Sequence, residues 1–100
     1  MLVATVMFGC AKQFLTCAHD QFSSFTCQQV LEAARSDVGL SGRRIEVIDV
    51  PSWAPARTAP DVALVVETDE SGTRTLILVG KRSIDPELHA WVVAEPASAP

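Results

Sequence analysis

The sequence lacks tyrosine altogether, and it holds only four Phe and two Trp in 100 residues. A core built from this chain must therefore depend on Val, Leu, Ile and Ala. Hydrophobic residues make up 48% of the chain and charged residues 20%, which is enough apolar surface for one packed domain of this length. We expect a single domain over residues 1–93 and a disordered Ala/Pro tail over residues 94–100.

Clusters of basic residues and long apolar runs are also missing. The formal net charge is −4, and the only basic pairs are Arg43-Arg44 and Lys81-Arg82. Because nucleic acids are normally bound by a basic patch, we expect no nucleic-acid partner. No apolar run approaches the roughly 20 residues that span a bilayer, and no basic residue precedes the apolar start of the chain. We therefore expect no membrane insertion and a cytoplasmic protein.

A CxxC motif is absent, although the chain has three cysteines. Cys10, Cys17 and Cys27 all lie near the start of the sequence. An odd number of cysteines without a secretory signal argues against a framework of structural disulfides. Their clustering is the most informative feature of the sequence, and it directs attention to thiol chemistry.

Apolar runs predict four β-strands, at residues 2–8, 45–50, 62–66 and 75–79. The first run is almost continuously apolar, which is typical of a strand buried on both faces. Residues 69–72 (Asp-Glu-Ser-Gly) predict a hairpin turn, so the last two strands should be antiparallel.

Helical periodicity appears once between the first two predicted strands. Cys27, Val30, Leu31 and Ala34 form one apolar stripe of a helix. Residues 23–24 (Ser-Ser) offer an N-cap, and glycines after the stripe end the helix. The stretch before it, residues 10–22, shows no period, and we expect an irregular loop there.

A second helix is predicted near the end of the chain. Asp85 is a suitable N-cap, and Pro86 suits the first helical turn. Leu88, Trp91 and Val92 then supply one apolar face. A strand, helix, strand start makes a right-handed crossover, so the first two strands should be parallel.

This order, β-α-β-β-β-α, resembles the thioredoxin/glutaredoxin superfamily over about residues 2–93, and part of it is similar to short bacterial thioredoxin-like proteins. The resemblance implies an α/β fold in which helices pack on a mixed four-stranded sheet. It also implies a cis-proline at Pro60 that shapes a peptide or thiol cleft. The residues that carry the resemblance are Phe8-Gly9, Ser23-Ser24, Leu31-Glu32-Ala33-Ala34 and Pro60.

The departure from that family is the cysteine motif itself. Phe14 stands where the first cysteine of a CxxC ending at Cys17 would be. We expect Cys17 to be the reactive thiol, because a helix N-terminus favours a thiolate. Cys10 is its expected resolving partner, and His19 could tune the thiolate. Cys27 falls on the apolar stripe, which favours core packing over a resolving role.

The leading hypothesis is therefore thiol–disulfide exchange or redox sensing with a protein or thiol partner and no cofactor. The alternative is a non-catalytic binding module, a homodimer included, with a sheet edge or Trp53 as the contact surface. An indole in such a connector more often folds back over the core. A zinc site of three cysteines and His19 comes third, because their spacing does not match structural zinc sites, and we expect no metal.

Overall fold

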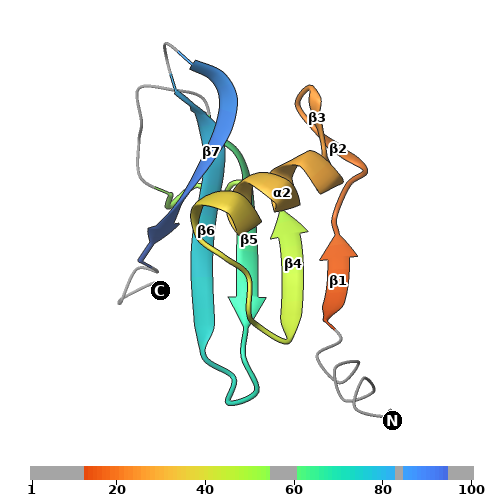
Figure 1. Ribbon diagram of the computed structural model, residues 1–100, viewed down its shortest axis with the longest axis vertical. Coiled ribbons are helices and arrows are strands. Elements are labelled where there is room, and N and C mark those ends of the chain that lie inside the picture. The colour runs from red at the N-terminus through yellow and green to blue at the C-terminus, as the bar shows by residue number, and fades with distance from the viewer. Residues whose placement is uncertain (1–12, 55–60, 83–84, 95–100) are drawn as a thin grey trace, which may run out of the picture.

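The computed structural model describes residues 13–54, 61–82 and 85–94. Five strands form one mixed sheet with two edges, as Figure 1 shows. The first two strands in the sheet order are parallel, and every later neighbouring pair is antiparallel. In sheet order the strands are β1 (Phe14–Cys17), β4 (Arg44–Ile48), β5 (Asp61–Thr68), β6 (Arg74–Arg82) and β7 (Asp85–Val93).

The helix α2 (Cys27–Asp37) provides the crossover between the parallel strands β1 and β4. The sequence predicted a helical crossover into this second strand, but with its first strand at residues 2–8. Its stripe of Cys27, Val30, Leu31 and Ala34 is buried, which confirms the helical period. Thr26 is the N-cap rather than a serine: its hydroxyl accepts from the Gln29 amide, and the Gln29 side chain accepts from the Thr26 amide. A short hairpin precedes the helix, with strands β2 (Gln21–Phe22) and β3 (Phe25–Thr26).

Both faces of the sheet are apolar. Helix α2 covers one face, where it packs on alternate residues of β4, β5 and β6. The opposite face carries a second cluster of Leu64, Val66, Leu76 and Leu78, against which Val50, Ala54 and Trp91 pack. Because β5 and β6 are buried on both faces, their sequences are continuously apolar rather than alternating. The predicted strands at 62–66 and 75–79, and the hairpin turn between them, are confirmed.

The predicted thioredoxin-like fold class is wrong. The chain is mostly β, with one helix among the described residues, and the expected β-α-β-β-β-α layout does not form. Residues 85–93, which carry N-cap and first-turn signals for a helix, instead form the strand β7 beside β6. Pairing with the open edge of β6 satisfies a ladder of backbone groups, and this tertiary gain overrides local helix signals. Leu88 and Ala90 face the helix side of the sheet, while Trp91 and Val93 face the other.

The first described strand is also not where the sequence predicted it. The strand β1 lies inside residues 10–22, which were predicted to be an irregular loop. All its residues are exposed, so the burial alternation that reveals a strand in sequence is missing. The predicted strand at residues 2–8 and residues 95–100 of the predicted tail lie outside the described residues. No helix in the described ranges is long and apolar enough to cross a membrane.

One polar cluster anchors the start of β1 to the loop before β4. The Gln13 side chain donates from Nε2 to the carbonyl oxygens of Leu40 at 3.0 Å and Gly42 at 2.9 Å. The buried Glu67 then accepts from the Gly42 amide at 2.5 Å. A Cβ on Gly42 would lie 2.2 Å from Cγ of Glu67, so only glycine fits there.

Candidate redox site at the end of the first strand

A disulfide joins the last residue of β1 to the first residue of α2. Cys17 and Cys27 are bonded, with their Cα atoms 6.3 Å apart and 10 positions apart in sequence. Cys17 is exposed, whereas Cys27 is only 6% exposed and belongs to the core cluster under the helix. The residue Cys17 is therefore open to solvent, while Cys27 is shielded by protein.

The expected pairing of Cys17 with Cys10 is corrected by this bond, because one sulfur takes part in one disulfide. Cys10 itself lies outside the described residues. The expectation that Cys27 packs in the core is right about its burial, but the residue is also the bonded partner. The sequence signal for Cys27 as a disulfide partner was its position at the start of the helical stripe, which places a cysteine at a helix N-terminus.

Helix α2 gives the two sulfurs different electrostatic surroundings. Cys27 follows the N-cap Thr26 directly, at the end of the helix where free amide groups and the helix dipole favour negative charge. Cys17 lies at the end of an exposed strand and has no such support from its own element. If the bond opens, this helix end therefore favours the negative charge of a thiolate on Cys27.

The loop between the two cysteines is held by contacts that do not depend on the disulfide. The Cys27 amide donates to the Asp20 carbonyl at 2.9 Å. Phe22 is 3% exposed and lies in the core, and Phe25 packs against the same cluster. The ammonium of Lys81 lies 5.8 Å from the centre of the Phe25 ring. These contacts should keep the two cysteines close together when the bond is reduced.

His19, the predicted thiolate-tuning residue, is oriented by neighbours on both sides. Its Nε2 atom lies 2.9 Å from Oδ2 of Asp49, and both side chains are largely exposed. Its ring meets the Phe22 ring edge-on, with centroids 5.4 Å apart. The described hydrogen bond of His19 thus goes to a carboxylate rather than to either sulfur. A role in tuning the thiol remains a prediction.

The other predicted site residues do not converge on the disulfide. Trp53, in the turn that follows β4, is 36% exposed, so its indole is neither deeply buried nor fully exposed. Pro60 lies outside the described residues. Within residues 13–54, 61–82 and 85–94, no group of three His, Cys, Asp or Glu side chains could hold a metal ion.

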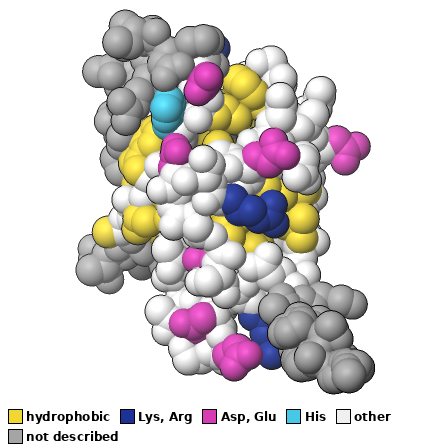
Figure 2. All heavy atoms as spheres, in the orientation of Figure 1, with side chains coloured by type: hydrophobic (Ala, Val, Ile, Leu, Met, Phe, Trp, Pro, Cys, Tyr) yellow, Lys and Arg dark blue, Asp and Glu magenta, His cyan; other side chains and the backbone are white. Residues whose placement is uncertain are grey.

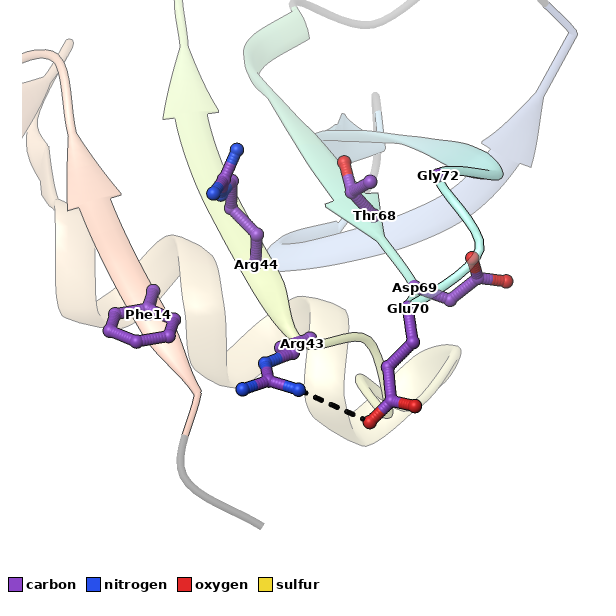
Figure 3. A pocket seen from close by; sticks show the side chains of 7 residues that line it. All are labelled: Phe14, Arg43, Arg44, Thr68, Asp69, Glu70 and Gly72. Carbon is purple, nitrogen blue, oxygen red and sulfur yellow. Dashed lines mark hydrogen bonds and ion pairs between the residues drawn. The ribbon is translucent and has the colours of Figure 1, made fainter. Parts of the chain in front are cut away.

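An open hollow of about 560 Å³ lies at the opposite end of β1, and Figure 3 shows the side chains that line it. Phe14 lines it from β1, while Arg43 and Glu70 cross it as an exposed ion pair 3.3 Å apart. Asp69 also lines the hollow, but its carboxylate already accepts hydrogen bonds within the β5–β6 turn. Arg43 and Glu70 are engaged with each other and Asp69 with its own turn, and Arg44 adds only a single further cation to the lining. We therefore assign the candidate site to the disulfide end of β1.

Comparisons of the chain with protein-family models, with curated proteins and with solved structures find no match. They therefore neither support nor oppose a relationship to the thioredoxin-like superfamily. Figure 2 shows the face that carries α2, where the Lys and Arg side chains lie apart with acidic side chains among them.

Proposed function

We propose that this protein exchanges its Cys17–Cys27 disulfide with thiols of a partner, as a thiol–disulfide exchange protein or redox sensor. The observation that carries the proposal is the asymmetry of the bond: one cysteine is exposed at a strand end and the other is buried at a helix N-terminus. Exchange needs an accessible sulfur to attack and a good leaving thiolate, and the two ends of this bond supply one each.

The exchange proceeds in two balanced steps. A partner thiolate attacks Sγ of Cys17, a new partner–Cys17 disulfide forms, and the electron pair of the broken bond leaves on Sγ of Cys27. A second partner thiolate then attacks the partner's sulfur in this mixed disulfide and releases Cys17 as a thiolate. The partner is thereby oxidised to a disulfide and this protein is reduced to a dithiol. A partner disulfide that reacts in the reverse order restores the Cys17–Cys27 bond.

Two properties support a reversible bond over a permanent staple. The contacts of Asp20, Phe22 and Phe25 hold the loop without the disulfide, so the dithiol can close again in place. In a cytoplasmic protein, which the sequence led us to propose, disulfides are usually transient and serve catalysis or redox sensing.

The test is a glutathione redox titration of the full chain, with alkylation of free thiols and mass spectrometry of each cysteine. We expect a reversible loss of two protons that maps to Cys17 and Cys27, with a midpoint above about −300 mV. The reduced protein should stay folded, with an unfolding free energy lower by about 2–3 kcal/mol because the closed loop is lost. A midpoint below about −300 mV, or reduction only on unfolding, would make the bond structural.

Variants of the three cysteines provide matched controls. The Cys17→Ser variant should lose the two-electron transition completely, because the remaining Cys27 thiol has lost its bonded partner. The Cys10→Ser variant should titrate like the unmodified protein. If Cys10→Ser instead abolishes the transition, Cys10 is a required partner and the assignment of Cys27 is wrong.

A further inference from the structure

The outer edge of β1 in the described sheet runs directly to the exposed Cys17. Phe14 and Ala18 donate their amides to the Arg43 and Val47 carbonyls of the β4 side, each at 2.9 Å. Because backbone groups alternate along a strand, the N–H and C=O groups of Leu15 and Cys17 point the other way, to the outside of the sheet. In the described sheet β1 is an edge strand, with β4 as its hydrogen-bonded neighbour (Figure 1).

This edge has the side chains of a pairing surface rather than of a protected one. Phe14 is 55% exposed and Leu15 is 49% exposed. The strand Phe14–Cys17 carries no charge and no proline, two of the devices by which edge strands commonly prevent pairing. An extended polypeptide can therefore add to β1 through backbone hydrogen bonds and gain apolar contacts on both faces of the strand.

Resting on the proposed exchange reaction, we propose that its substrate is an extended, cysteine-containing polypeptide that pairs antiparallel with β1. In such a pairing the outward groups of Cys17 would form a hydrogen-bonded pair with the residue opposite, at a Cα–Cα distance of about 5.5 Å. Disulfides bridge Cα atoms about 4.4–6.8 Å apart. A peptide cysteine opposite Cys17 therefore stands at bonding distance for the mixed disulfide.

A polypeptide substrate suits this edge better than a second copy of the chain does. The strand β1 has four residues, and stable dimers usually bury more than about 1,000 Å². A short strand offers only a small part of that area. A substrate needs no such area, because weak strand pairing raises the local concentration of its thiol and the mixed disulfide then holds it.

The experiment measures how fast the oxidised full chain forms mixed disulfides with two kinds of thiol. One is a Thr/Val-rich peptide with a single central cysteine, and the other is glutathione. A matched peptide is N-methylated at the cysteine and at the residue two positions later, the two amides that would face Cys17 and Leu15, so it cannot pair with β1 as a strand. We expect the unmodified peptide to react about tenfold faster than the N-methylated one, because two or more backbone hydrogen bonds are lost.

A variant of β1 tests the protein's side of the pairing. Leu15→Pro removes an amide that points away from β4, so the sheet should be kept, as a melting curve can check. It should slow the unmodified peptide by about tenfold and leave the glutathione rate unchanged. Leu15→Ala keeps the amide and should slow the peptide less.

Equal rates for both peptides would overturn strand pairing and leave thiol exchange standing. A bond that reacts with neither peptide nor glutathione would overturn the exchange reaction itself, and the substrate proposal with it. A concentration-dependent dimer that Leu15→Pro abolishes would assign this edge to a second copy of the chain and overturn the peptide substrate.

Discussion

The two edges of the sheet are protected to different degrees. At the β7 edge, the Ala90 amide donates to Oδ2 of Asp37 at 2.9 Å, which ties the strand to the end of α2. His89 lies 3.5 Å from the same carboxylate, and Pro86 removes one amide from the strand. At the β1 edge no such contact reaches the outward backbone groups among the described residues, and Phe14 is more than half exposed.

This difference between the edges fits the proposal that the β1 edge receives a substrate strand. The same chain places a side chain and a proline on one edge and neither on the other. Edge strands left apolar and uncharged invite pairing with other chains, which is a liability unless pairing is used. In that proposal the disulfide at the end of β1 supplies a use, because an added strand would run up to Cys17.

The largest expected effect comes from the cluster that anchors β1. In Gly42→Ala the new Cβ would lie 2.2 Å from Cγ of Glu67, so the carboxylate or the loop must move. We expect the unfolding free energy to fall by about 1–3 kcal/mol, as in other overpacked sites. Amides of β1 should exchange faster than those of β7, since Gln13 binds the Gly42 carbonyl. Urea denaturation and hydrogen exchange measure both.

The exposed neighbour Ser41 is the control for that substitution. Ser41→Ala adds no clash and should change the unfolding free energy by less than about 0.5 kcal/mol. If Gly42→Ala is as stable as Ser41→Ala, the tight approach of Glu67 does not hold in solution. Equal exchange at both edges would show that Gln13 does not anchor β1.

The next largest effect is expected from a substitution that removes the protection of the β7 edge. Asp37→Ala leaves the Ala90 amide without its acceptor, and we expect the unfolding free energy to fall by about 1–2 kcal/mol. Asp37→Asn keeps an oxygen at this position and should recover most of the loss. Sedimentation should show self-association of the alanine variant, since a second edge is then open. A monomeric alanine variant of unchanged stability would show that the two edges are equally protected.

Sequence reasoning succeeded where buried side chains leave a clear hydrophobic pattern in the sequence. The four-residue stripe beginning at Cys27 predicted α2, and the continuous apolar runs of β5 and β6 predicted a buried hairpin. In each case the side chains face a core, so hydrophobicity records the geometry. The parallel crossover was also predicted, although its first strand was placed at residues 2–8 rather than at β1.

It failed at both edges, where local signals and packing disagree. The strand β7 carries Asp85 and Pro86, which begin helices well, but the open side of β6 draws these residues into the sheet. The strand β1 is wholly exposed and shows no period at all. Cys10 was expected to be the partner of Cys17, whereas Cys17 is bonded to Cys27. Spacing along the chain cannot show that the hairpin around Phe22 returns Cys27 to the end of β1.

A smaller effect concerns the hairpin inside the disulfide loop. Ser23 has φ of 60°, in the left-handed region that disfavours side chains. Ser23→Gly relieves this strain but loosens the unfolded chain, so we expect a gain of up to about 1 kcal/mol in unfolding free energy. Ser24→Gly is the matched control, and it should cost about 0.5–1 kcal/mol because φ there is not positive. Thermal denaturation of both oxidised variants distinguishes them, and a destabilised Ser23→Gly would contradict the strain.

The smallest effect lies between the edges, at the turn that joins β5 to β6, and it depends on pH. The side-chain hydrogen bond from Ser71, with amide bonds from Thr73 and Ser71, holds the pKa of Asp69 below its ordinary value of 3.8. Folding therefore favours the ionised carboxylate, and this stabilisation is complete above pH 3.8 and is lost as the pH falls through the folded pKa.

Asp69→Asn keeps an acceptor oxygen in this turn but removes the titration. Between about pH 5 and pH 2.5, urea midpoints of the unmodified protein should fall more than those of the variant. Because the described hydrogen bonds of the Asp69 carboxylate stay within the β5–β6 turn, amide exchange at β1 and β7 should respond alike to this substitution. An identical acid dependence of the two proteins would contradict the role of the carboxylate. A response confined to β1 would mean that the turn also supports the open edge.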